Sequence, residues 1–152
     1  SDERKNFQKY YKSEGHYRTS QKNFKEYEKK YHSISRSNED NEWVTLYHGY
    51  NAILRGKDKT PKTLLRANKT LYLHDNPLNC VDELGLAPSQ VDILKIKIAK
   101  SVYDDLKIKR RASQLSFEDK GDPKSMYILP GKKMKLADYL HHSGFIQIGR
   151  GK

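Results

Sequence analysis

The chain has 152 residues, enough for one domain with a sizeable hydrophobic core, and it carries 30 Lys and Arg against 19 Asp and Glu, a formal net charge of +11. Only 35% of the residues are hydrophobic, no apolar stretch reaches the about 20 residues of a transmembrane helix, and the single cysteine, Cys80, excludes an internal disulfide and a cysteine-based zinc site. We expect no membrane insertion. The charge favours nucleic acid or an acidic protein as the partner, or else it serves solubility alone.

For residues 1–42, the sequence predicts a helical arm that is rich in Lys and Tyr. Its apolar residues are almost all aromatic, and they recur at the spacings of three, four and seven that place side chains on one helix face. Such a face either packs on the domain or stacks nucleic-acid bases while the lysines neutralise phosphates. Two short helices, broken near Gly15, would carry Phe7, Tyr10 and Tyr11, and then Phe24, Tyr27 and Tyr31.

Short strands separated by turn residues are predicted for residues 43–152. The β-branched and aromatic run 43–48 ends at Gly49 and presents His48, and residues 70–73 predict a second strand that stops at Asp75-Asn76-Pro77. Gly85 would close a short helix over 81–86.

The run 91–98 alternates apolar residues with lysines and predicts a half-buried strand, in which Leu94, Ile96 and Ile98 share one face. Residues 126–129 and 145–148 predict two further strands, with a short strand over 132–136 and a helical turn over 137–142 between them. The sequence therefore predicts an α+β fold, with N-terminal helices followed by a mostly antiparallel, twisted sheet.

Three motifs occur in the order found in one enzyme family. They are Leu46-Tyr47-His48-Gly49, then Leu71-Tyr72-Leu73 with Asp75-Asn76-Pro77, and then Met126 to Gly131. In this order they resemble the diphtheria-toxin-like branch of the ADP-ribosyltransferase superfamily, which has a His-Tyr-Glu signature. The resemblance implies NAD as substrate, no metal, and transfer of ADP-ribose to a macromolecular target, nucleic acid or protein.

The resemblance also implies roles for single residues. His48, followed by Gly49, would hold a ribose hydroxyl of NAD, and Tyr72 would stack on the nicotinamide. Independently of the resemblance, the pyrophosphate of NAD needs basic or backbone donors, and Arg55 or Arg66, both between the first two strands, are candidates for its cation. The alternatives are a structural histidine bonded within a strand and a core aromatic residue.

The chain departs from the family pattern at Met126, which stands where the family places its catalytic glutamate. Methionine neither hydrogen-bonds the ribose nor stabilises the oxocarbenium-like state. A carboxylate or amide from elsewhere would have to replace it, or else the domain binds nucleotide or RNA without turnover. The candidates for this replacement are Glu118, Asp119 and Asp122 on a loop, and Gln147 on the last strand, which we expect to lie next to the strand of Met126.

Basic residues gather in two segments, which we expect to rim one face and to contact phosphates of the target. Solvated surface lysines would look the same in sequence. The two segments contribute Lys107, Lys109, Arg110 and Arg111, and then Lys132, Lys133 and Lys135.

A basic, metal-independent ribonuclease is the rival interpretation. Its acid and base would be His141 and His142, next to Tyr139, with Lys133 or Lys135 on the phosphate. Neighbouring residues point in different directions, which argues against the two histidines as a simple dyad.

The first residues lack the apolar region of a signal peptide. We interpret the chain as the effector or toxin module of a larger bacterial protein, delivered to the cytosol of a target cell. An acidic neutralising (immunity) protein is then a natural partner.

Overall fold

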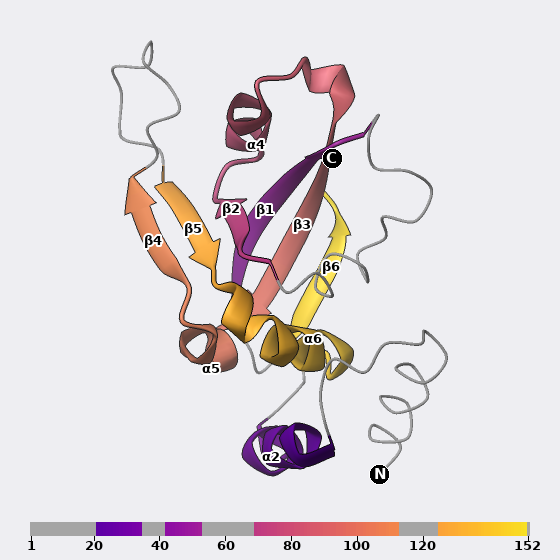
Figure 1. Ribbon diagram of the computed structural model, residues 1–152, viewed down its shortest axis with the longest axis vertical. Coiled ribbons are helices and arrows are strands. Elements are labelled where there is room, and N and C mark those ends of the chain that lie inside the picture. Colours follow the sequence, from indigo (N-terminus) through magenta and orange to yellow (C-terminus); the bar gives the residue numbers. More distant parts are fainter. Residues whose placement is uncertain (1–20, 35–41, 53–68, 113–124, 152) are drawn as a thin grey trace.

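The computed structural model describes residues 21–34, 42–52, 69–112 and 125–151. The fold is mixed α+β, as predicted, with a six-stranded sheet in the order β4-β5-β2-β1-β3-β6 whose neighbouring strands are all antiparallel (Figure 1). The strands are β1 (Trp43–Asn51), β2 (Leu71–His74), β3 (Val91–Ala99), β4 (Lys109–Ala112), β5 (Ser125–Leu129) and β6 (Ile146–Arg150). The helices are α2 (Gln21–Tyr31), α4 (Pro77–Leu84), α5 (Lys100–Tyr103) and α6 (Met134–His142), with 3-10 turns η1 (Pro88–Gln90), η2 (Asp104–Leu106) and η3 (Gly131–Lys133).

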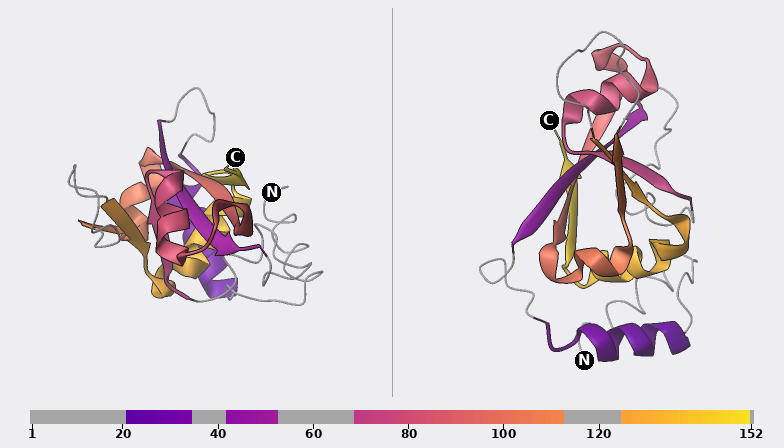
Figure 2. Two further views of the ribbon diagram at one scale, coloured as in Figure 1. Left: turned by 90° about the horizontal axis from the view of Figure 1, so that it is seen from above. Right: turned by 90° about the vertical axis from the view of Figure 1, so that its left-hand side faces the viewer.

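The sheet consists of two halves that meet between β1 and β2. β1 pairs with β3 along its whole length, from Trp43 opposite Ala99 to Asn51 opposite Val91. With β2, in contrast, β1 shares one residue pair, Tyr47 opposite His74. The two strands run apart beyond that pair, as Figure 2 shows. This divergence separates the half β4-β5-β2 from the half β1-β3-β6.

The main core lies between the sheet and the helices α2 and α6. Tyr139 of α6 is 1% exposed, and Phe24, Tyr27 and Tyr31 of α2 surround its ring at centroid distances of 5.7, 5.3 and 6.2 Å. Aromatic pairs at such distances stabilise beyond the area they bury. The predicted aromatic face of α2 is therefore a packing face. The predicted first helix, with Phe7, Tyr10 and Tyr11, lies outside the described residues.

A smaller core lies on the other face of the sheet, under α4. It contains Cys80 of α4 and Val91 and Ile93 of β3. Because α4 covers the face that carries Val91 and Ile93, the predicted alternation of buried residues with lysines appears only in the second part of β3. The strand prediction for 91–98 is confirmed.

α4 begins earlier than the sequence predicted, at Pro77 in place of residue 81. The Asn76 side chain accepts a hydrogen bond from the Leu78 backbone N–H at 2.9 Å, and Pro77 occupies the first turn. Asn and Pro are favoured at these helix positions. The residues that stop β2 therefore also start α4. Gly85 closes the helix at φ 63°, as predicted.

The prediction of a strand over 132–136 is wrong, because η3 and α6 occupy this segment. Met134 and Leu136 alternate with lysines as in a strand, but Met134, Ala137 and Leu140 are all fully buried at a helical spacing of three. The edge strand β4 was not predicted either. Among the helices of the described residues, none is long and apolar enough to span a bilayer.

Candidate functional site

The three motifs of the sequence lie on three neighbouring strands, β5, β2 and β1. His74 of β2 is opposite Tyr47 of β1 on one side and opposite Met126 of β5 on the other. One row of the sheet thus crosses all three motif segments. His48 follows Tyr47 by one residue, and Tyr72 precedes His74 by two.

His48 and Tyr72 are joined where β1 and β2 diverge. His48 Nδ1 lies 3.0 Å from the backbone oxygen of Tyr72. A carbonyl oxygen only accepts, so Nδ1 carries the hydrogen and donates it. In the neutral ring, Nε2 is then the acceptor nitrogen. An acceptor at this position suits a hydroxyl donor, such as that of a ribose. His48 itself is half-buried, and the Tyr72 side chain is 41% exposed, so Tyr72 is not a core aromatic residue.

Gly49 is needed for packing, whatever its role towards a ligand. It is buried under α4, and a Cβ at this position would lie 2.7 Å from the Cβ of Cys80. Non-bonded carbon atoms prefer a separation of about 3.5–4.0 Å. The missing side chain lets α4 approach β1. The family motif places Gly49 beside the cofactor. The close approach of Cys80 is by itself sufficient to require a glycine at this position.

Met126 is buried at 8% exposure on β5, opposite His74. His74 is fully buried, and its Nε2 donates to Oε2 of Glu83 on α4 at 2.9 Å. Tyr72 and His74 alternate with the core residues of β2, so they share the face that α4 covers. Glu83 is thus a carboxylate on the Tyr72 face of β2, beside the row that contains Met126. Sequence reasoning missed it, because it lies within the helix and outside the motifs.

Of the other candidates for the missing carboxylate, only Gln147 is among the described residues, and it does not lie beside Met126. Gln147 is on β6, at the opposite edge of the sheet from β4, with β2, β1 and β3 between β5 and β6. The expectation that its strand neighbours the strand of Met126 is therefore wrong. The order of strands along the chain does not fix their order in the sheet. Glu118, Asp119 and Asp122, like Arg55 and Arg66, lie outside the described residues.

The two basic segments meet at one end of the β4–β5 pair. Lys109, which starts β4, is opposite Ile128 near the end of β5, and η3 follows β5 directly (Figure 1). Arg110 is tied to the sheet, since its Nε donates to Ser125 Oγ at 3.0 Å and its guanidinium lies 5.8 Å from the centre of the Tyr127 ring. Half-buried Lys133 apart, the residues of both segments are exposed: Lys107, Lys109, Arg110, Arg111, Lys132 and Lys135.

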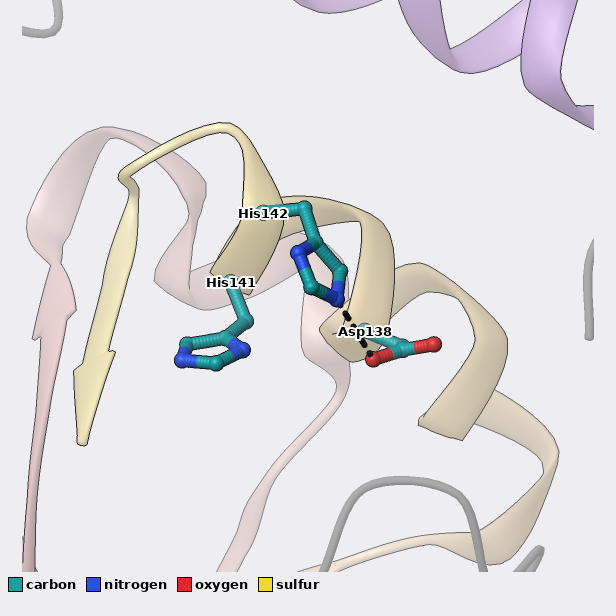
Figure 3. A group of neighbouring side chains, drawn as sticks. All are labelled: Asp138, His141 and His142. Carbon is teal, nitrogen blue, oxygen red and sulfur yellow. Dashed lines mark ion pairs between the residues drawn. The ribbon is translucent and has the colours of Figure 1, made fainter. Parts of the chain in front are cut away.

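His141 and His142 lie closer together than the sequence suggested. Both are on the last turn of α6, with ring centroids 5.2 Å apart, and the His142 ring points towards Asp138 one turn earlier, whereas the His141 ring lies to its side (Figure 3). One potential ligand atom from each of the three residues falls within 4.8 Å of the others. Asp138 is fully buried, and this burial raises the pKa of its carboxyl to about 8. His142 Nε2, at 3.6 Å, is too far for a hydrogen bond that would offset the burial.

Cys80 is an unreactive core thiol. It is fully buried beside Gly49, and burial raises the pKa of its thiol to about 12, with a further contribution from Glu83. The thiolate is the nucleophilic form of cysteine. Nucleophilic catalysis by Cys80 is therefore not supported.

Comparisons with known proteins add no relative. No protein-family model matches the chain, and no curated protein and no solved structure matches it significantly. The likeness to ADP-ribosyltransferases therefore rests on the sequence motifs.

Proposed function

We propose that the chain is an NAD-dependent ADP-ribosyltransferase module of the toxin or effector type. The observation that carries this proposal is the hydrogen bond from His48 Nδ1 to the Tyr72 carbonyl at the divergence of β1 and β2. This bond joins the two residues that the family motifs assign to NAD. It also gives the histidine the tautomer whose Nε2 accepts from a ribose hydroxyl.

The proposed chemistry is cleavage of the nicotinamide–ribose bond. Tyr72 offers an exposed ring on which nicotinamide stacks, and His48 orients the ribose. As the bond breaks, positive charge develops on the ribose, and an anion placed beforehand stabilises it. We assign that anion to Glu83, in place of the residue at position 126. His74, bonded to Oε2 of Glu83, holds the carboxylate in position.

The basic residues at the end of the β4–β5 pair are the proposed contact with the target. Their exposed positive charge suits a polyanion, so we propose nucleic acid or an acidic protein as the molecule that receives ADP-ribose. Lys109, Arg110 and Arg111 also protect an edge strand from pairing with another sheet, which is a sufficient reason for their charge.

The test is to incubate the purified chain with NAD labelled in its adenine, together with bacterial RNA and protein, and to follow nicotinamide release, label transfer and RNA length. We expect nicotinamide release with label on RNA or protein. RNA that is shortened without consumption of NAD would refute the transferase and support the ribonuclease. Nucleotide binding without any product would support the non-catalytic interpretation.

Variants connect the activity to the site. His48→Ala and Tyr72→Ala should each lower the rate by about a hundredfold or more, whereas Tyr72→Phe keeps the stacking ring and most of the rate. The matched control is His32→Ala, because exposed His32, in the turn that follows α2, makes the same kind of bond, from Nδ1 to the Lys29 carbonyl at 2.9 Å.

The role of Glu83 has its own pair of variants. Glu83→Gln keeps a hydrogen-bond acceptor for His74 but removes the charge, and should lower kcat more than it changes KM. Asp82→Asn, at the exposed neighbouring position on α4, removes a charge without touching His74 and should leave both unchanged. Equal effects of the two variants would contradict the assignment.

A further inference from the structure

The carboxyl group of Asp138 is the least compensated polar group that the structure describes on α6. Its side chain is fully buried, and neither of its oxygens accepts a hydrogen bond from the described residues. Removing a carboxylate from water without donors is strongly unfavourable, and native proteins rarely leave such a group without a partner. A buried carboxyl of this kind calls for a partner that supplies positive charge.

The separation between Asp138 and His142 fits a shared metal ion better than a direct contact. Oδ1 and Nε2 are 3.6 Å apart, which exceeds the length of a charge-assisted hydrogen bond. Bonds of about 2.1 Å in a tetrahedral site place two ligand atoms about 3.4 Å apart. The observed distance is thus within a few tenths of an ångström of the distance that an ion between the two atoms would require.

His141 supplies the third donor. Asp138, His141 and His142 occupy positions i, i+3 and i+4 of α6, so all three project towards the same side of its last turn, and their ligand atoms lie within 4.8 Å (Figure 3). The C-terminal end of a helix also carries a partial negative charge, which favours a cation.

We propose that Asp138, His141 and His142 bind one divalent transition-metal ion, with zinc as the preferred ion. Two imidazoles and one carboxylate suit zinc, whereas calcium and magnesium prefer oxygen ligands alone. The His142 side chain is 17% exposed, so water reaches the site and can complete the coordination. The ion stabilises the last turn of α6, from which the chain turns through Ser143 and Gly144 into β6.

The site is independent of the proposed transferase activity, because it lies on α6, whereas His48 and Tyr72 lie on β1 and β2. The test uses the full chain without a polyhistidine extension, stripped with a chelator and then titrated with Zn²⁺ by calorimetry. We expect one zinc ion per chain, and a Tm that rises by about 5 to 10 °C when free zinc is a hundredfold above its Kd. Co²⁺ should give the visible absorption of a low-symmetry centre with nitrogen and oxygen ligands.

The variants distinguish a metal site from a direct ion pair. Asp138→Asn and His142→Gln should each raise the zinc Kd at least about tenfold. In the absence of zinc, Asp138→Asn should melt no lower than the wild type, since it removes an uncompensated group, whereas loss of an ion pair would lower the Tm with or without zinc. His32→Gln, at an exposed position in the turn that follows α2, is the control and should bind zinc like the wild type.

Absence of saturable zinc binding would overturn the proposal, as would binding that survives both Asp138→Asn and His142→Gln. Should Asp138→Asn fail to fold, the double variant His141→Gln and His142→Gln makes the same distinction at two half-buried positions. Zinc binding that this double variant retains would equally overturn the proposal.

Discussion

Replacement of Gly49 by alanine tests the packing of α4 against β1. The new Cβ would lie 2.7 Å from the Cβ of Cys80, 3.4 Å from Cγ1 of Val91 and 3.5 Å from the carbonyl oxygen of Cys80. Since a comfortable carbon–carbon separation is about 3.5–4.0 Å, α4 and β1 must move apart by about 1 Å. No side-chain rotation relieves this contact, because a Cβ is fixed to its backbone.

The magnitude follows from two opposing terms. Overpacking of a close-packed core costs about 1 to 3 kcal/mol, and we take about 2 kcal/mol for this contact. Alanine also restricts the unfolded chain, which stabilises by about 0.4 to 1 kcal/mol where the backbone conformation allows it. Gly49 does not have a positive φ, so this second term applies. The net destabilisation is about 1 to 1.5 kcal/mol.

Gly149 on β6 provides the matched control. A Cβ there meets nothing within 4 Å, and its φ is not positive either. Gly149→Ala should therefore be neutral or stabilising by up to about 1 kcal/mol. Urea unfolding, followed by the fluorescence of Trp43 on β1, measures both variants, and the m value should stay constant. The reasoning fails if the two variants agree within about 0.5 kcal/mol.

Two further predictions concern α4 and the core beneath it. Asn76→Ala removes the hydrogen bond to the Leu78 N–H and should lower the free energy of unfolding by about 1 kcal/mol in the same urea assay, whereas an unchanged midpoint would mean that Asn76 does not cap the helix. Burial raises the pKa of the Cys80 thiol to about 12 and also raises that of Tyr31, so both groups stay protonated in the folded chain while the unfolded chain releases their protons at lower pH. The contribution of these two groups to the free energy of unfolding is then fully present below about pH 9. Above it, the free energy of unfolding should fall by up to about 1.4 kcal/mol per group and pH unit. Cys80→Ala should flatten this decline between pH 9 and 11, and a decline as steep as that of the wild type would contradict the buried thiol.

Most strands of the sheet could be predicted from the sequence, because alternation and turn residues are local signals. Val91 to Ile98 alternates clearly, and Asp75-Asn76-Pro77 breaks the chain where β2 ends. β4 was missed, because three of its four residues are basic and gain their strand conformation by pairing with distant β5. Such pairing depends on tertiary context, which a local pattern does not contain.

The candidate site was predictable only where a motif named the residue. His48 and Tyr72 were found in this way, and the structure joins them, although their role remains a proposal. Glu83 was missed, because only the start of α4 at Pro77 and the contact with His74 bring it to the β2 face. The Asp138 cluster was missed although a helical turn was predicted over 137–142, because the spacing of Asp138, His141 and His142 within that turn was not recognised as a ligand pattern.

α4 connects the stability of the domain to its proposed chemistry. The helix starts at the Asn76 cap directly after β2, lies against β1 through the Gly49–Cys80 contact, and carries Glu83 to His74. A shift of about 1 Å between α4 and β1, as expected for Gly49→Ala, would also move the Glu83 carboxylate relative to Tyr72. Misplacement on this scale costs enzymes up to about a hundredfold in rate. Gly49 would then matter to an NAD site without touching the ligand, and the position of α4 would explain why a glycine stands beside His48.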